Sequence, residues 1–322
     1  MNEMLKVALL GIGNINNAHR EAWKQIPEAQ VVALCDIRPE QMEEPKKEFA
    51  CPAYTDFDEM LKNEDFDVLD ITLPTYMHPA YSIKALNAGK HVITEKPVSL
   101  HKEDVQLIYE AAERNGKCFM VAQCVRFWRE YLILKDAIDT KKYGALLSGH
   151  MERLGNKPKW SWDNWMRDPA RSGLVPFDLH IHDLDFMIYA LGRPQAARCF
   201  RARDDSQDYI QVLYQYPGFF ITAQAAWFNS DYRFRSGFRF QFEHALLEYK
   251  DGKMTIYREN DTPIQVTGAS DEGKDITQVG SNAYLNEIRY FVDCVLEGKP
   301  CDEVKPKELI DVLEMIEIID QA

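Results

Sequence analysis

Short apolar runs alternate with amphipathic stretches through the first 120 or so residues of the chain. The apolar runs have the length and residue types of β-strands and lie at Lys6–Leu10, Gln30–Asp36, Val68–Thr72, His91–Thr94 and Cys118–Ala122. Helical spacing of apolar residues separates them, at about Asn14–Gln25, Pro39–Phe49, His78–Ala88 and Lys102–Asn115. Strands that alternate with helices in this way predict a parallel sheet with helices on both faces.

The pattern changes after about residue 124. Several later segments alternate apolar and polar residues with a period of two, as in QVLYQY and FRFQFE, which is typical of a sheet with one covered face. The predicted strands are Leu146–Arg153, Ala197–Arg203, Tyr209–Tyr216, Phe219–Phe228, Phe238–Phe242, Leu246–Lys250 and Met254–Arg258. One predicted helix, about Phe177–Leu191, interrupts the series, and Asn282–Glu297 and Pro306–Ile319 return to helical periodicity.

A chain of 322 residues is longer than one hydrophobic core usually serves, so two domains are expected. The predicted class is α/β plus α+β. Residues 1–123 form a doubly wound parallel sheet of the Rossmann type. Residues 124–322 form a domain with a large, mostly antiparallel sheet covered by helices on one face, which binds substrate and mediates oligomerisation.

Composition narrows the possible partners. The net charge of −13 argues against non-specific binding to nucleic acid or to an anionic membrane. The chain has no run of about 18 apolar residues and no signal-peptide pattern at its start, so a cytoplasmic protein is expected. Its seven cysteines include no C-x-x-C pair, which favours reduced thiols over a disulfide framework or a structural zinc site.

A glycine-containing turn connects the first predicted strand to the first helix. The order is Gly11-Ile-Gly13-Asn14-Ile15-Asn16. Glycine at the first two positions permits a tight turn and a close approach of the backbone to a pyrophosphate, which then faces the helix N-terminus. Asn16 replaces the usual third glycine, which predicts that the helix start packs less tightly or tilts. The turn and its flanking elements predict a dinucleotide site.

The end of the second predicted strand supports this interpretation. Asp36 lies 20 residues beyond Asn16, where an acid accepts hydrogen bonds from a ribose 2′-hydroxyl and repels a 2′-phosphate. Arg38 is placed to pair with a 2′-phosphate. The sequence therefore favours NAD and leaves NADP open.

Three further motifs resemble the Gfo/Idh/MocA oxidoreductases, a family that includes glucose–fructose oxidoreductase and inositol dehydrogenase. They are Asp70–Pro74 followed by His78, the phrase GKHVITEKP at Gly89–Pro97, and SGLVPFDLHIHDLDFMIYALG at Ser172–Gly192. The positions that match the family pattern are Thr72, Pro74, His78, Glu95, Lys96, Pro97, Asp178, His182, Asp185 and Gly192. The resemblance extends over essentially the whole chain.

The resemblance implies that Lys96 and His182 act at the reacting hydroxyl, with Asp178 beside them. The residue types suit that chemistry. Oxidation of a secondary alcohol needs a base for the hydroxyl proton, and histidine has an unperturbed pKa of about 6.5. A lysine hydrogen-bonds the substrate oxygen and stabilises negative charge there. Asp178 and His182 are four residues apart, hence on one face of a helix, where the carboxylate supports the imidazole.

The candidate residues fall into two sets. The predicted cofactor-binding residues are Gly11, Gly13, Asn14, Ile15, Asp36, Arg38, Thr72, Leu73, Pro74, His78, Glu95, Lys96 and Gln123. The predicted substrate-binding residues are Lys96, Arg126, Trp165, Asp178, His180 and His182. A salt bridge of Arg126 and core packing of Trp165 agree with the sequence equally well as alternatives to substrate binding. No metal is expected, because His180 and His182 point to different faces of a helix.

The predicted function is transfer of hydride between NAD(P) and a secondary hydroxyl of a sugar, a cyclitol or a related polyol. Two alternatives remain: an NAD-dependent glycoside-cleaving enzyme of the same family, and a non-catalytic regulator that binds dinucleotide. The aromatic-rich sheet in the second half needs its other face covered, so a homodimer or homotetramer through that sheet is expected.

Overall fold

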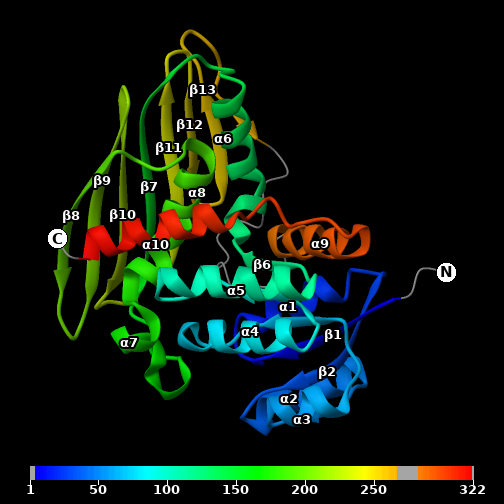
Figure 1. The fold of residues 1–322 in the computed structure, drawn as a ribbon. Coiled ribbons are helices and arrows are strands. Elements are labelled where there is room, and N and C mark those ends of the chain that lie inside the picture. The colour runs from blue at the N-terminus through cyan, green and yellow to red at the C-terminus, as the bar shows by residue number, and fades with distance from the viewer. Residues whose placement is uncertain (1–3, 267–281, 321–322) are drawn as a thin grey trace. The chain divides into compact units, whose positions relative to one another are not determined.

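The chain folds into two units in the computed structural model, which describes residues 4–266 and 282–320 (Figure 1). The described part of the first unit comprises residues 4–124 and 282–306. The second unit comprises residues 125–266 and 307–320. Each unit contains one sheet with its own core.

The sheet of the first unit is parallel throughout and has the order β3-β2-β1-β4-β5-β6. Its strands are β1 (Leu5–Leu10), β2 (Ala29–Cys35), β3 (Ala53–Tyr54), β4 (Val68–Ile71), β5 (His91–Glu95) and β6 (Phe119–Ala122). The strand order reverses between β1 and β4. In sheets of this kind ligands bind at that reversal, outside the carboxyl ends of the strands.

Helices connect these strands. They are α1 (Asn16–Trp23), α2 (Pro39–Phe49), α3 (Phe57–Asn63), α4 (His78–Asn87) and α5 (Lys102–Asn115), with a short turn η1 (Thr75–Met77) before α4. Strands β4 and β6 are buried along their whole length. Burial on both faces explains why the sequence shows apolar runs there rather than alternation. The predicted Rossmann-type sheet is confirmed.

The sheet of the second unit has the order β14-β13-β12-β11-β7-β10-β9-β8. Its strands are β7 (Leu146–Asn156), β8 (Ala196–Arg203), β9 (Asp208–Tyr216), β10 (Phe219–Phe228), β11 (Arg235–Phe242), β12 (Leu246–Lys250), β13 (Lys253–Tyr257) and β14 (Ile264–Val266). Only β7 and β10 pair in parallel, so the predicted mostly antiparallel sheet is confirmed. The three residues of β14 are too few to show a pattern, which is why the sequence did not predict them.

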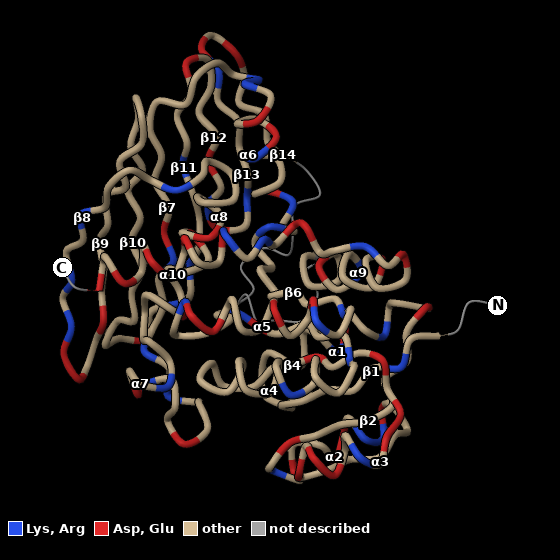
Figure 2. The backbone as a smooth tube through the Cα atoms, in the orientation of Figure 1, with Lys and Arg blue, Asp and Glu red and all other residues tan. Residues whose placement is uncertain are grey.

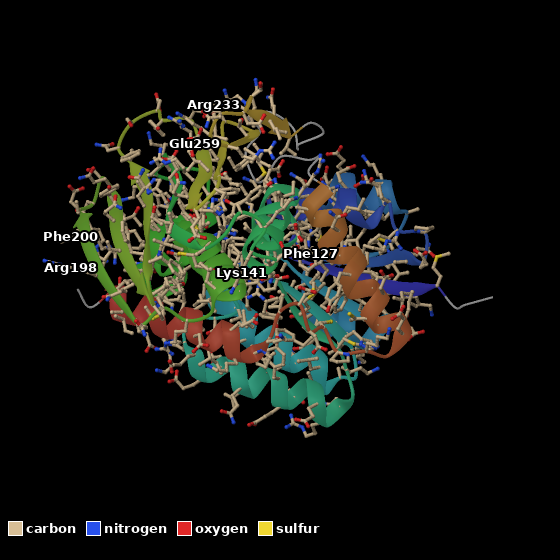
Figure 3. The ribbon with its side chains drawn as sticks, turned by 90° about the horizontal axis from the view of Figure 1, so that it is seen from above. Phe127, Lys141, Arg198, Phe200, Arg233 and Glu259 are labelled. Carbon is tan, nitrogen blue, oxygen red and sulfur yellow. The ribbon has the colours of Figure 1, made fainter. Side chains whose placement is uncertain are left out.

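Helical segments accompany this sheet. They are η2 (Cys124–Phe127), α6 (Arg129–Asp139), η3 (Trp162–Arg167), α7 (Pro169–Ser172), η4 (Pro176–His180), α8 (Ile181–Leu191) and α10 (Pro306–Asp320). Strand β9 shows how the two faces differ, since Ile210, Val212 and Tyr214 are buried while Leu213 between them is 40% exposed. Phe200 of β8 is 59% exposed, beside Arg198 at the edge of the sheet (Figure 3).

The helix α9 (Asn282–Glu297) belongs to the first unit. The predicted boundary after residue 123 lies within one residue of the division at Cys124, but the second domain is not continuous to the end of the chain. Arg289 forms a salt bridge with Glu28 at 2.5 Å, and the ring of Tyr284 lies 5.9 Å from that of His19 in α1. The apolar face of α9 therefore packs on α1. These helices lie far apart in the sequence, so local periodicity does not predict their contact.

The predicted single helix over Phe177–Leu191 is two segments. Pro176–His180 is a turn of π-helix, and α8 begins at Ile181. A π-turn accommodates an extra residue and occurs frequently at functional sites. It changes the angular relation between Asp178 and His182 that a regular helix predicts. None of the helices within residues 4–266 and 282–320 carries an apolar stretch that would span a bilayer.

Candidate functional site

The turn after β1 meets the requirements of a pyrophosphate cradle. Gly11 has φ +88°, and a Cβ atom there would lie 2.8 Å from the carbonyl oxygen of Thr72. At Gly13 a Cβ atom would meet no other atom within 4 Å. Glycine at position 11 is thus required by the fold itself. At position 13 it leaves open space beside the N-terminus of α1, as a bound phosphate needs.

Asp36 closes this turn from the end of β2. Its carboxylate accepts hydrogen bonds from the amide of Ile12 at 2.7 Å and from the amide of Arg38 at 2.8 Å. The Arg38 side chain also faces it, with 3.4 Å between Nε and Oδ1. The sequence predicted Asp36 as a ribose ligand. The structure gives it a second task, because it also braces the glycine turn.

Asn16 is fully buried at the start of α1. Its Nδ2 donates to Oγ1 of Thr72 at 3.1 Å, and that hydroxyl in turn donates to the carbonyl of Gly11. The side-chain amide therefore joins the helix to the end of β4. This hydrogen bond takes the place of the close packing of helix on strand that a third glycine would permit.

His78 connects two of the family motifs. One ring nitrogen lies 2.6 Å from the carbonyl oxygen of Pro97, and the other lies 2.7 Å from that of Leu73. Burial lowers the pKa of His78, so the neutral ring donates to one of these carbonyls at a time. The sequence predicted His78 as a cofactor ligand. Its ring is engaged in holding the loops after β4 and β5 together.

Lys96 follows β5 at the carboxyl edge of the same sheet. The buried Glu95 accepts the Lys96 amide hydrogen bond at 3.0 Å through Oε2, while its Oε1 lies 3.1 Å from Nε2 of His19. Glu95 is thus directed into its own unit. His19 is a residue that the sequence analysis missed. The available signal was a histidine and a tryptophan four residues apart, His19 and Trp23, on the buried face of a short helix.

Gln123 ends the row of predicted cofactor residues, just after β6. It is 1% exposed, and its buried Nε2 has no hydrogen-bond partner among the described residues. A buried orphan donor is rare in a protein by itself and fits a polar ligand group. This donor and the open space at Gly13 are features that a bound dinucleotide would use.

The second unit places Asp178 and His182 on either side of the junction between η4 and α8. Asp178 is half-buried and His182 is 4% exposed. Trp165 is half-buried in η3, and the chain reverses there through positive φ angles at Asp163 and Asn164. The roles of these three side chains toward a substrate stay predictions.

His180 is buried against the sheet, and its predicted role in substrate binding stays a prediction. The ring is fully buried, lies 2.6 Å from the hydroxyl of Tyr214 through Nε2, and stacks on the tyrosine ring with centroids 5.8 Å apart. Burial lowers its pKa to about 3, so it is neutral. The one-residue register change of the π-turn directs it into the core between helix and sheet.

Arg126 forms ion pairs within its own unit, and its predicted role toward a substrate likewise stays a prediction. Its Nε and Nη2 donate to the carboxylate of Asp185 at 2.8 and 2.6 Å, and its Nη1 donates to Glu308 at 2.5 Å. The side chain is fully buried and lies against the ring of Tyr189. The salt bridge that the sequence left open is present, but inside the unit rather than on its surface.

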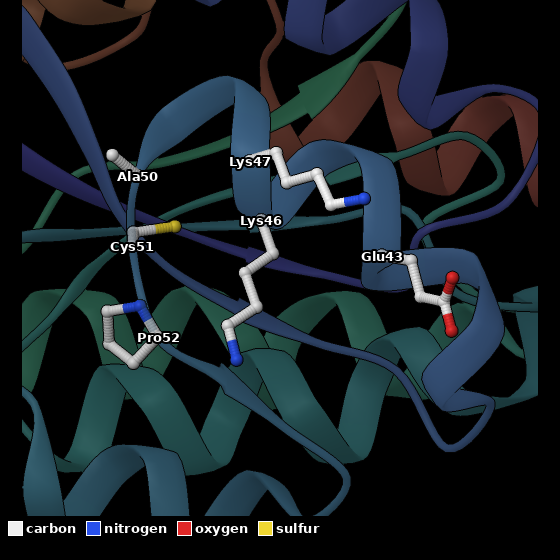
Figure 4. Close-up of a pocket in the computed structure, with 6 residues that line it drawn as sticks. All are labelled: Glu43, Lys46, Lys47, Ala50, Cys51 and Pro52. Carbon is white, nitrogen blue, oxygen red and sulfur yellow. The ribbon is translucent and has the colours of Figure 1, made fainter.

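The described residues hold no group of three or more His, Cys, Asp or Glu side chains that would bind a metal ion. Figure 4 shows a surface hollow at the end of α2. It precedes β3 and so lies at the amino ends of the strands, away from the Gly11 turn, and it is lined by Glu43, Lys46, Lys47, Ala50, Cys51 and Pro52.

Comparison with protein families identifies the family to which this chain belongs. Residues 5–123 match the model described as "Oxidoreductase family, NAD-binding Rossmann fold". Residues 131–255 match the "GFO/IDH/MocA C-terminal domain". The chain belongs to the Gfo/Idh/MocA oxidoreductase family. Its first unit is accordingly an NAD-binding Rossmann domain, and the family resemblance predicted from the motifs is confirmed.

Members of the Gfo/Idh/MocA family similar to this chain have names that refer to cyclitols and sugars. A myo-inositol 2-dehydrogenase of Thermotoga maritima is 28% identical over 58% of this chain and 55% of its own. An inositol 2-dehydrogenase of Salmonella typhimurium is 32% identical over 45% of each. The aligned part thus spans about half the length of these curated relatives. A solved levoglucosan dehydrogenase with NADH and levoglucosan has the same fold, with a TM-score of 0.85, 19% identity, and coverage of 99% of this chain and 97% of that one.

Substitution of the two glycines in the turn is expected to have different effects, one on NAD⁺ binding and the other on stability. Gly13→Ala leaves the free energy of unfolding within about 0.5 kcal/mol of the wild type, because the new methyl group meets no atom. It weakens NAD⁺ binding about 10-fold or more, because the methyl group occupies the pyrophosphate space. Gly11→Ala is the matched variant. It is expected to lower the free energy of unfolding, because its Cβ atom would lie 2.8 Å from the carbonyl oxygen of Thr72. Isothermal titration and urea unfolding measure both, and a Gly13→Ala protein with wild-type NAD⁺ affinity contradicts the assignment.

Proposed function

We propose that this protein is an NAD-dependent dehydrogenase that oxidises a secondary hydroxyl of a sugar, a cyclitol or a related polyol. The observation that carries the proposal is Lys96 held by Glu95 at the edge of the sheet that bears the Gly11 turn. Family membership and the names of the relatives support the substrate class. The pair Asp178 and His182 supplies the residue types that the reaction needs.

Gly11, Gly13, Asp36 and Gln123 would hold the cofactor, whose nicotinamide ring supplies the hydride-accepting chemistry when bound. The backbone at Gly13 approaches the pyrophosphate, and the Asp36 carboxylate accepts hydrogen bonds from the ribose. The buried Nε2 of Gln123 offers a donor to a polar group of the ligand. Asp36 is a poor neighbour for a 2′-phosphate, so we propose NAD⁺ over NADP⁺ as the preferred form. Dissociation constants for the two test this.

The residues of this chain have distinct tasks at the substrate. Lys96 donates a hydrogen bond from Nζ to the substrate oxygen and stabilises its negative charge as the proton leaves. The imidazole of His182 accepts that proton, and the Asp178 carboxylate favours the cationic imidazole that results. Near-complete burial of His182 limits the access of water to the base.

The test is a panel of sugars, cyclitols and polyols, with NADH formation followed by absorbance. Oxidation of at least one of them with NAD⁺ is expected. Cleavage of a glycoside with retained NAD and no net NADH would replace this proposal by the glycoside-cleaving alternative. Tight NAD⁺ binding without any turnover would favour a regulator.

We further propose that the open face of the second unit's sheet forms a homodimer or homotetramer. Large apolar side chains on neighbouring strands are exposed there, namely Phe200, Leu213 and Phe220. Acidic and basic residues elsewhere are interspersed along the chain (Figure 2). Phe200→Glu is expected to lower the mass measured by light scattering at micromolar concentration, because a charge there must be desolvated on association. A wild-type mass of one chain contradicts the proposal.

A further inference from the structure

A chain of hydrogen-bonded side chains runs through the core of the Rossmann unit and ends at Lys96. The Nδ1 atom of His19 lies 2.9 Å from Oδ2 of Asp70, and its Nε2 lies 3.1 Å from Oε1 of Glu95. Trp23 donates from Nε1 to the same Asp70 oxygen at 2.7 Å. His19 and Asp70 are fully buried and Glu95 nearly so. The elements involved are α1, β4 and β5.

The protonation state of His19 follows from its neighbours. Each ring nitrogen faces a carboxylate, and only the doubly protonated imidazolium donates to both. Burial lowers the pKa of His19, but the two carboxylates outweigh it and raise the pKa well above 6.5. A neutral ring would leave two buried carboxylates without a cation between them, an arrangement that proteins avoid because each charge must be desolvated.

The other groups around this ring do not change that balance. Tyr284 of α9 lies against His19, and its own pKa is raised well above the usual value by burial and by nearby acids that include Glu95 and Glu287. Its hydroxyl is therefore neutral. Trp23 is a neutral donor. His19 supplies the positive charge between Asp70 and Glu95.

Glu95 links His19 to Lys96. One of its oxygens faces His19 and the other accepts the amide hydrogen bond of Lys96. We propose that His19 is a positioning residue that orients Glu95 and offsets its charge, and so fixes the place and electrostatic surroundings of Lys96. The inference rests on the proposed function in so far as Lys96 meets the substrate. Without the imidazolium, the buried Glu95 carboxylate loses the positive charge that His19 supplies.

The first experiment uses the wild-type protein and needs no substrate. The chain has eight histidines, and the His19 signal is identified by its loss in His19→Gln. Nuclear magnetic resonance of ¹⁵N-labelled histidine is expected to show an imidazolium at position 19 above about pH 7, where ordinary histidines have lost their proton. A ring that loses its proton below about pH 7 overturns the proposal.

The second experiment separates positioning from stability. His19→Gln retains one donor but not the charge, and it is expected to lower kcat about 10- to 100-fold with a smaller change in the KM for NAD⁺. Its pH profile is expected to move about half a pH unit or more toward higher pH, because the loss of a positive charge near the site raises the pKa of neighbouring groups. Trp23→Phe removes a neutral donor from the same cluster and is expected to leave the profile in place.

The outcomes separate this inference from the proposed function. A His19→Gln profile that superimposes on the wild-type profile, with kcat reduced no more than in Trp23→Phe, overturns the positioning role. If the wild type oxidises no polyol, the proposed function fails, and the resonance experiment decides the state of His19. If His19→Gln does not fold, Glu95→Gln replaces it. That change removes a negative charge and retains an acceptor for the Lys96 amide, so its pH profile is expected to move toward lower pH, and a profile that superimposes on the wild-type profile overturns the proposal.

Discussion

Lys96→Ala is expected to lower kcat for polyol oxidation about 10³-fold, because the developing negative charge on the substrate oxygen loses its donor. Lys96 is half-buried, and its backbone is anchored by Glu95, so removal of the side chain beyond Cβ leaves the loop in place. Affinity for NAD⁺ is expected to change much less than kcat. Stopped-flow measurement of NADH formation, with NAD⁺ binding measured separately, distinguishes the two effects.

His182→Ala is the companion variant and is expected to lose about 10² to 10⁴ in kcat through loss of the base. Lys90→Ala is the matched control for Lys96. Lys90 lies before the same strand β5, at its amino end, where Nζ donates to the carbonyl of Phe66 at 2.6 Å. It is expected to retain wild-type kcat. Turnover that survives in both Lys96→Ala and His182→Ala would disprove the assigned mechanism.

The second large effect is on stability. Arg126→Met is expected to destabilise the protein by about 3 to 5 kcal/mol, because it leaves the buried Asp185 without its cation. Burial already raises the pKa of Asp185, and the Arg126 guanidinium opposes that rise. Urea unfolding, followed by circular dichroism, measures the loss of stability.

Arg193→Met is the control for Arg126. It breaks the salt bridges of Arg193 with Asp311 and Glu314. Arg193 is 37% exposed, so a cost of at most about 1 kcal/mol is expected. If Arg126→Met instead unfolds like the wild type and only raises the KM for the polyol, then the original prediction of a substrate-binding Arg126 is correct and its place in the core is wrong.

Local patterns in the sequence identified the Rossmann sheet and its cofactor turn well, because each depends on short-range chemistry. Apolar runs predict buried strands, and a turn at Gly11 needs the conformation that only glycine adopts easily. The alternation in β9 and β11 also predicted a sheet with one covered face. The limits of that approach appear at Arg126 and His180, whose partners lie far away in the sequence.

The sequence by itself determined the family, the parallel and antiparallel sheets, and the identity of Lys96, Asp178 and His182 as candidates. Only the tertiary structure decided which polar residues turn inward. Arg126 meets Asp185 and Glu308, and His19 meets Asp70 and Glu95, across separations of 51 to 182 residues. A buried charge is tolerated only beside a partner, and that partner is chosen by how helices and strands pack, which no local pattern records.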